Sequence, residues 1–134
     1  MRGLISRSVL FGLLAAGAVA AADLTGIWTG QAPGRRDQME DLAFQFKVEG
    51  QMVTGKLFGD EFDLPIEEGV LTGDQVRFVV TTTNYYSGNK TQTAFTGTIR
   101  GSELELTRER LPAPGEDTTK RENPKHTFTL KKLT

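Results

Sequence analysis

Apolar and polar side chains alternate with a period of two along most of the chain beyond residue 23. In residues 42–49, for example, Leu42, Phe44 and Phe46 fall on one face and mostly polar side chains on the other. This period is that of a β-strand with one buried and one solvated face. No segment has the three- and four-residue apolar spacing of an amphipathic helix. The pattern therefore predicts an all-β protein.

Eight such segments follow one another, mostly across short turns. We expect strands at residues 25–32, 42–49, 52–58, 62–66, 76–82, 93–99, 103–110 and 126–133. In the fourth, Phe62, Leu64 and Ile66 share the inward face. Pro65 has no amide hydrogen, so a bulge or gap is expected beside it. Consecutive hairpins favour an eight-stranded antiparallel up-and-down barrel, in which the first and last strands have no exposed edge; a β-sandwich is the alternative.

Because the expected strands alternate in direction, each turn or loop can be assigned to one of the two ends of this barrel. Tight turns at Gly50, Gly73 and Gly101 all fall at one end. The other end receives the longer loops at residues 33–40, 84–90 and 111–125, together with the turn at 59–61. Binding residues concentrate on loops over a rigid scaffold, so the end with the longer loops is where we expect a ligand.

Residues 1–22 have the pattern of a secretory signal peptide. Arg2 and Arg7 precede a short apolar run at Val9–Ala16, and small-residue cleavage motifs follow at 18–20 and 20–22. The apolar run is shorter than the ~20 residues that span a bilayer. We therefore expect an exported protein, periplasmic or extracellular, with a single domain at residues 23–134 and no stable membrane insertion after cleavage.

The composition of the remaining chain excludes several classes of protein. Arg2 and Arg7 are the only charges removed with the signal, so the net charge of −1 becomes about −3, which argues against nucleic-acid binding. The chain has no Cys and 1 His, so disulfides, thiolate sites and His-rich metal sites are excluded. Acidic residues near Asp60 and Asp63 lack the spacing of a calcium loop, and solvated turns are the preferred interpretation. We expect no metal and no cofactor.

Four short segments carry a resemblance to known barrels. Residues 24–28 and 126–129 resemble the first and last strands of avidin-type barrels, and residues 71–73 and 93–97 resemble internal avidin hairpin segments. The Gly-x-Trp of Gly26 and Trp28 is similar to the wider calycin group, which includes the lipocalins. The resemblance implies an eight-stranded barrel with a ligand-binding mouth.

The same resemblance does not extend to a biotin site. Avidin-like sites place an Asn two residues after the first Trp, where this chain has Gly30. They surround biotin with several Trp residues, whereas this chain has 1. The Asp of the family's last strand is replaced by His126. The resemblance therefore implies a barrel with a mouth, and these departures from the family predict that biotin is not its ligand.

Six residues share inward parity or a loop position at the expected open end. The candidate ligand-binding residues are Thr82, Tyr86, Thr93, Arg108, Arg110 and His126. Two guanidinium groups in a mouth suit a carboxylate or phosphate, which Arg binds through paired hydrogen bonds. The alternative is that both Arg side chains are solvated or paired with Glu109 or Glu116.

Trp28 and Lys132 are expected to have a structural role. Trp28 would fill the closed end of the barrel, with Lys132 of the last strand against its ring as a cation–π partner. No Ser lies in a Gly-x-Ser-x-Gly turn and His126 has no Cys partner, so we do not expect an enzyme.

Two functions remain. The first is a binding protein for a small molecule at the open barrel end, with an anion as one candidate ligand. The second is a protein-interaction or protease-inhibitor-like module with no small-molecule ligand, in which the proline-rich loop 111–125 would contact the partner protein.

Overall fold

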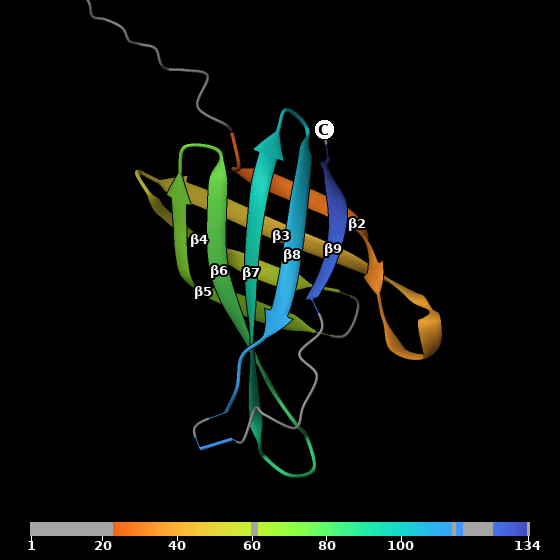
Figure 1. The fold of residues 1–134 in the computed structure, drawn as a ribbon. Helices are drawn as coiled ribbons and strands as arrows, with labels where there is room; N and C mark the ends of the chain where they lie inside the picture. Colours follow the sequence, from red (N-terminus) through yellow and green to blue (C-terminus); the bar gives the residue numbers. More distant parts are fainter. Residues whose placement is uncertain (1–22, 60–61, 114, 117–124, 134) are drawn as a thin grey trace, which may run out of the picture.

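A computed structural model describes residues 23–59, 62–113, 115–116 and 125–133. The strands are β2 (Gly26–Pro33), β3 (Met39–Glu49), β4 (Met52–Phe58), β5 (Asp63–Thr72), β6 (Gln75–Thr83), β7 (Lys90–Arg100), β8 (Glu103–Arg110) and β9 (Lys125–Lys132). They form one closed barrel in chain order (Figure 1). The expected signal peptide at residues 1–22 lies outside the described residues.

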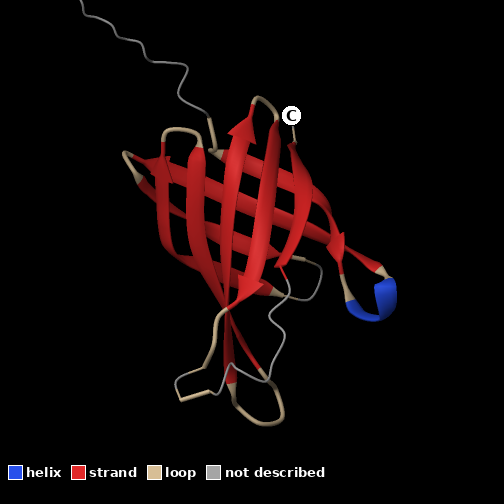
Figure 2. Ribbon diagram, viewed as in Figure 1, coloured by secondary structure: helices blue, strands red, loops and turns tan. Residues whose placement is uncertain are grey.

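The barrel is antiparallel throughout, and its last strand pairs with its first. β9 joins β2 through the register pairs Trp28↔Lys132, Thr29↔Lys131 and Gly30↔Leu130. The helical part of the described chain is one 3-10 turn, Arg35–Asp37 (Figure 2), and no helix in that part is long and apolar enough to cross a membrane. The predicted all-β, eight-stranded up-and-down barrel is confirmed.

Four phenylalanines form the centre of the core. Phe44 stacks on Phe46 with ring centroids 5.5 Å apart, and Phe78 stacks on Phe95 at 5.0 Å. The two stacks meet edge to face at 5.3–5.6 Å. Each such aromatic pair adds about 0.5–1.5 kcal/mol beyond the area it buries. The period of two brings these rings together, because it directs every second side chain of β3, β6 and β7 inward.

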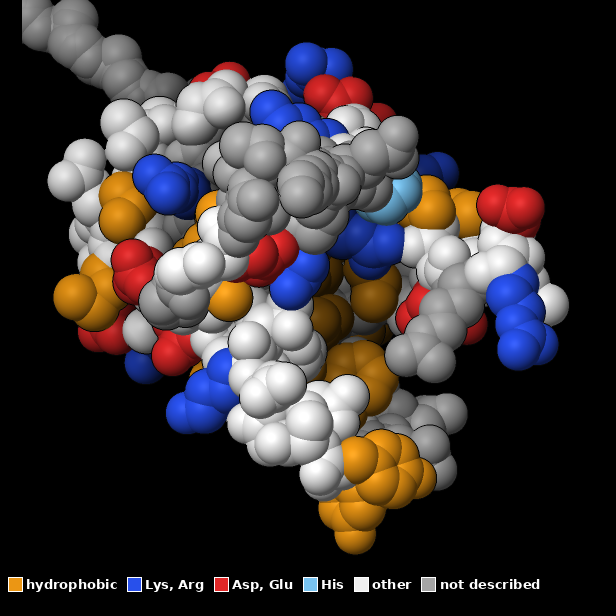
Figure 3. Space-filling model, turned by 60° about the horizontal axis from the view of Figure 1, so that its bottom comes forward, with side chains coloured by type: hydrophobic (Ala, Val, Ile, Leu, Met, Phe, Trp, Pro, Cys, Tyr) orange, Lys and Arg blue, Asp and Glu red, His pale blue; other side chains and the backbone are white. Residues whose placement is uncertain are grey.

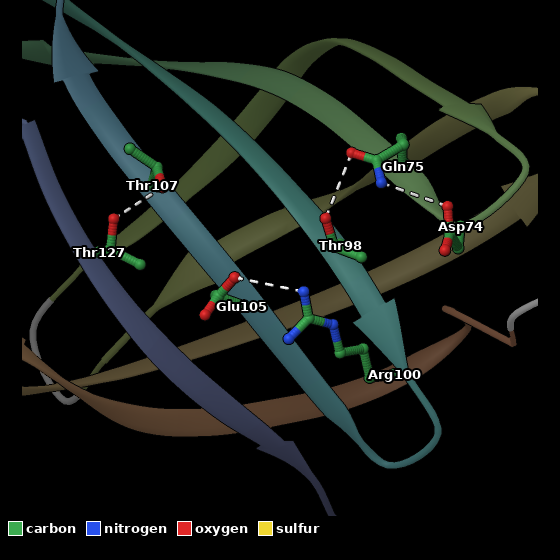
Figure 4. A network of polar contacts seen from close by, with 7 residues as sticks. All are labelled: Asp74, Gln75, Thr98, Arg100, Glu105, Thr107 and Thr127. Atoms are coloured by element: carbon green, nitrogen blue, oxygen red, sulfur yellow. Dashed lines mark hydrogen bonds and ion pairs between the residues drawn. The ribbon is translucent and has the colours of Figure 1, made fainter.

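The outer face is polar, and cross-strand contacts connect its side chains. On β8 and β9 the hydroxyl oxygens of Thr107 and Thr127 lie 2.8 Å apart. Thr98 donates a hydrogen bond to Gln75 Oε1 at 3.3 Å. Figure 4 shows these contacts with two others, Arg100–Glu105 and Gln75–Asp74. The alternation therefore separates an apolar interior from a hydrogen-bonded exterior.

Phe62 is an apolar residue that the alternation assigns to the core and the structure does not. It precedes β5, and 42% of its surface is exposed. The inward positions of β5 begin with the half-buried Leu64 and continue at Ile66. The register between β5 and β6 begins at Ile66, so the expected gap does lie beside Pro65. The assignment of Phe62 to the core was wrong, because the strand begins only after it.

β5 also changes its inward parity along its length. Ile66 is buried at an even position and Leu71 at an odd one. Between them the registers with both neighbouring strands shift, and Glu68 has a positive φ of 55°. One extra residue in a bulge reverses which side chains face inward. The strand thereby continues to Thr72 with its apolar residues still in the core.

The two ends of the barrel differ as the chain directions predicted. Gly50, Gly73 and Gly101 have φ values of 65°, 61° and 64° in the tight turns at the upper end in Figure 1. Leu24, just before β2, is buried at this end, and its carbonyl accepts a 2.9 Å hydrogen bond from Trp28 Nε1. The connections with more residues lie at the opposite end, which is the open end discussed below.

Candidate functional site

Thr93, Arg108 and His126 lie close together on neighbouring strands at the open end. Arg108 on β8 is the register partner of His126 on β9 and of Phe95 on β7. Thr93 lies one inward position further out on β7, beside Arg110. Thr93, Arg108 and His126 are all half-buried. Their parity is that of the core residues Leu106 and Phe128, so the barrel directs them into its mouth.

Arg108 reaches past the neighbouring strand β9 to β2. Its Nη2 donates a hydrogen bond to the carbonyl oxygen of Pro33, the last residue of β2. Its guanidinium carbon lies 5.6 Å from the centroid of the Phe128 ring, which is cation–π distance. Among the described residues no Asp or Glu forms an ion pair with Arg108. This half-buried cation is therefore held in place by a carbonyl and a ring, and no described carboxylate neutralises it.

Arg110 is directed to the loop that follows β8. Its Nη2 lies 3.6 Å from Glu116 Oε1, which also accepts a 2.9 Å hydrogen bond from the amide of Ala113. Arg110 is exposed, whereas Arg108 is half-buried. Of the two cations, Arg108 alone combines inward parity with partial burial.

Thr82 and Tyr86 lie beyond the mouth, on a hairpin that projects from the barrel (Figure 1). Thr82 is exposed, and its hydroxyl donates a 3.4 Å hydrogen bond to the Thr91 carbonyl across the hairpin. Tyr86 is in the turn at its tip, with 92% of its surface exposed. The structure thus brings together Thr93, Arg108 and His126, with Arg110 beside them, but not Thr82 and Tyr86.

Apolar side chains lie below the rim of the open end. Figure 3 shows hydrophobic side chains in a hollow there, with both basic and acidic side chains around its edge. Four buried core residues in the half of the barrel toward this end keep 7–9% of their surface exposed: Leu42, Leu57, Ile66 and Phe128. Leu71, beside the closed-end turn at Gly73, keeps 9%. Trp28 and Leu104, toward the closed end, are 0% exposed. None of Leu42, Leu57, Ile66 and Phe128 was a candidate site residue from the sequence, although their positions toward the loop-bearing ends of their strands carried that information.

The closed end holds the two residues expected there. Lys132 Nζ lies 5.8 Å from the centroid of the Trp28 ring. The same ammonium group is 3.2 Å from a carboxylate oxygen of Asp23 and 3.3 Å from its carbonyl oxygen. Trp28 is fully buried, so this end offers no opening beside the ring.

Position 30 has no room for a side chain. A Cβ on Gly30 would lie 2.6 Å from the Thr129 carbonyl oxygen and 2.7 Å from Leu130 Cδ2. The Asn that an avidin-like biotin site needs there would therefore collide with β9. In the described part of the chain no group of three or more His, Asp or Glu side chains is arranged to hold a metal ion. Asp63 is bonded to Lys56 at 3.1 Å, and Asp60 and Glu61 lie outside the described residues.

No family model, curated protein or solved structure matches the chain. The closed eight-stranded antiparallel barrel is consistent with a calycin-like architecture.

Proposed function

We propose that the protein is an exported binding protein that holds a small anionic molecule at the open end of its barrel. The observation that carries this proposal is Arg108, a half-buried cation without a described carboxylate partner, at the rim of an apolar hollow. Burying an unpaired charge is costly, and an anion that enters the mouth removes that cost. The avidin and lipocalin likeness supports the same kind of site, since those barrels bind ligands through one open end.

The arrangement favours a ligand with an acidic head and an apolar body. A carboxylate can accept hydrogen bonds from the guanidinium of Arg108, from a ring nitrogen of His126 and from the hydroxyl of Thr93. The apolar body would then lie against the Phe128 ring and against Leu42, Leu57 and Ile66. We propose binding without catalysis and without a cofactor.

Octanoate and its neutral counterpart octanamide test this proposal, because they share one apolar body and differ in charge. We expect octanoate to raise the melting temperature of the purified protein. At 100 times its Kd, the ligand should add about 2.7 kcal/mol to the free energy of unfolding. Arg108→Gln is expected to weaken octanoate binding about tenfold or more in calorimetric titration, since hydrogen bonds to charged groups contribute ~1.5–3 kcal/mol.

Arg77→Gln is the matched control, because Arg77 is an exposed cation on the outer face of β6. Its octanoate affinity is expected to equal that of the wild type. Equal binding of octanamide and octanoate, or equal losses in the two Arg variants, would contradict the proposal.

A protein-interaction function is the second candidate. The loop 111–125 proposed for it lies largely outside the described residues. A different element favours this function, namely the projecting hairpin with Tyr85 and Tyr86 at its tip.

A further inference from the structure

The hairpin of β6 and β7 extends past the barrel and ends in an uncharged aromatic turn. The turn consists of Asn84, Tyr85, Tyr86, Ser87, Gly88 and Asn89. Tyr85 and Tyr86 are each 92% exposed, more than any other exposed large apolar side chain in the described residues. We call residues 84–89 the tyrosine tip. In Figure 1 the tip lies beyond the open-end termini of β8 and β9, the strands that carry Arg108 and His126.

The backbone of the tyrosine tip is held in one conformation by its own hydrogen bonds. The Asn84 amide donates to the Asn89 carbonyl at 2.8 Å, and the Gly88 amide donates to the Asn84 carbonyl at 2.9 Å. The Asn84 side-chain oxygen accepts hydrogen bonds from the amides of Tyr86 and Ser87, both at 2.9 Å. Gly88 supplies the left-handed conformation, with φ of 75°. The tip is therefore ordered before it meets anything, which reduces the entropy lost on binding.

The two rings stand at right angles on this turn. Their centroids are 5.3 Å apart and their planes meet at 85°. Most apolar side chains of the barrel are buried, whereas these two large rings are exposed. Their hydrophobic surface therefore has no partner elsewhere in the described chain. Such anchors are enriched at the centres of protein interfaces.

We propose that the tyrosine tip is a docking element that inserts into a concave cleft of a partner protein, one with apolar walls and hydrogen-bond acceptors for the phenol hydroxyls. Tyr, Ser, Gly and Asn, the residue types of the tip, are also those that dominate antibody binding loops. There Tyr supplies rigid amphipathic contact area, and the small polar residues supply adaptable hydrogen bonds. This inference is independent of the ligand proposed for the mouth.

A protein cleft fits the tip better than a membrane or a glycan. Membrane-surface binding by exposed aromatics needs a large apolar face and clustered basic residues, whereas Lys90 is the one charge within or directly next to the tip in sequence. Stacking on a sugar needs an open, flat ring face. Rings that meet at 85° cannot both lie flat on one sugar, but they can occupy perpendicular walls of a cleft.

The test uses the full chain in its own host, with a photo-reactive benzoylphenylalanine in place of Ser87 or, as the control position, Met52. Met52 is 62% exposed on β4, near the opposite end of the barrel. A partner protein that is cross-linked from position 87 but not from position 52 is then identified and purified. Its Kd is then measured by calorimetry for the wild type, the double variant Tyr85→Ser/Tyr86→Ser and the control Met52→Ser.

We expect the double variant to bind that partner at least thirtyfold more weakly while its melting temperature is unchanged, and Met52→Ser to bind as the wild type does. Three outcomes would overturn the inference: no product specific to position 87, equal affinity of the double variant, or tyrosine-dependent binding to phosphatidylglycerol vesicles instead of a protein. A change of sedimentation coefficient in the double variant would assign the tip to contacts between copies of this chain, and would also overturn it.

Discussion

Gly30 lies where β2 packs so close to β9 that no side chain fits. A methyl group there would lie 2.6 Å from the carbonyl oxygen of Thr129, a backbone atom that cannot rotate away. We therefore expect Gly30→Ala to force β2 and β9 apart and to lower the free energy of unfolding by about 1–3 kcal/mol. Urea denaturation of the two proteins measures this difference.

Thr29→Ala is the control for this substitution. Thr29 is the neighbour of Gly30 on β2, and its side chain lies on the outer face. Its removal is expected to change stability by less than about 0.5 kcal/mol, as surface substitutions usually do. If Gly30→Ala is equally mild, the strands are less closely packed than the structure shows.

At the scale of single residues, the sequence predicted well which side chains face inward, but it did not predict which atoms they contact. Arg108 and His126 face the mouth because a period of two places them with Leu106 and Phe128. The hydrogen bond from Arg108 to the Pro33 carbonyl was not predictable, because it joins residues 75 positions apart across the closed barrel. Tyr86 was expected at the mouth because alternation does not reveal how far a hairpin extends beyond the barrel.

Among the elements, β5 departs most from a regular strand. Its registers shift against both β4 and β6. Glycines on β4 and β5 allow backbones to come close there: a Cβ on Gly55 would lie 1.8 Å from the Gln45 carbonyl oxygen, and one on Gly69 would lie 2.2 Å from that of Val53. These glycines are required for the bulge and for the strand contacts around it.

Comparing Gly55→Ala with Gly73→Ala separates two costs of replacing a glycine: the clash of a new Cβ with a neighbouring strand, and the strain of a positive φ. Both glycines have positive φ, 146° and 61°, but a Cβ on Gly73 meets nothing within 4 Å. Gly73→Ala is expected to cost about 1–2 kcal/mol, from the left-handed conformation alone. Gly55→Ala is expected to cost at least about 2 kcal/mol more, since a backbone carbonyl must also move.

Equilibrium denaturation of both variants gives the comparison. Equal costs would mean that β3 and β4 separate easily at this position. The sequence could not predict these shifts, because a bulge leaves the composition of a strand unchanged and alters only which residues pair. Pro65 predicted a bulge or gap beside itself, where the register with β6 begins only at Ile66, and it did not predict the shift between Glu67 and Val70.

The whole molecule has one sealed end and one open end. Trp28, Leu24 and the three glycine turns close the first, whereas apolar side chains and the half-buried Arg108 line the second. This polarity was predictable, because strand direction and turn length are both visible in a sequence. Closure itself followed from eight alternating segments, which would otherwise leave two unpaired edges.

Amide hydrogen exchange should differ between the hairpin that projects from the open end and the barrel core. Residues 82–91 belong to a hairpin beyond the core, whereas Leu104, Leu106 and Leu130 are 0% exposed. We expect the hairpin amides to exchange at least about a hundredfold faster than those of the three leucines, because local opening exposes no core there. Similar protection in both regions would mean that the hairpin is anchored by more than its own strand pairs.

The junction of β2 and β9 has a mechanical consequence. The two strands are antiparallel, and the chain enters β2 and leaves β9 on the same side, where Asp23 and Lys132 touch. A load pulling on the two termini would therefore separate the strands one hydrogen bond at a time, like a zipper, because antiparallel ladder bonds lie perpendicular to the strands. In the described residues, three register pairs and the 2.8 Å hydrogen bond from the Leu133 amide to the Ile27 carbonyl join them. A force applied at the two ends of the barrel would thus open the junction of β2 and β9 before it reached the aromatic core.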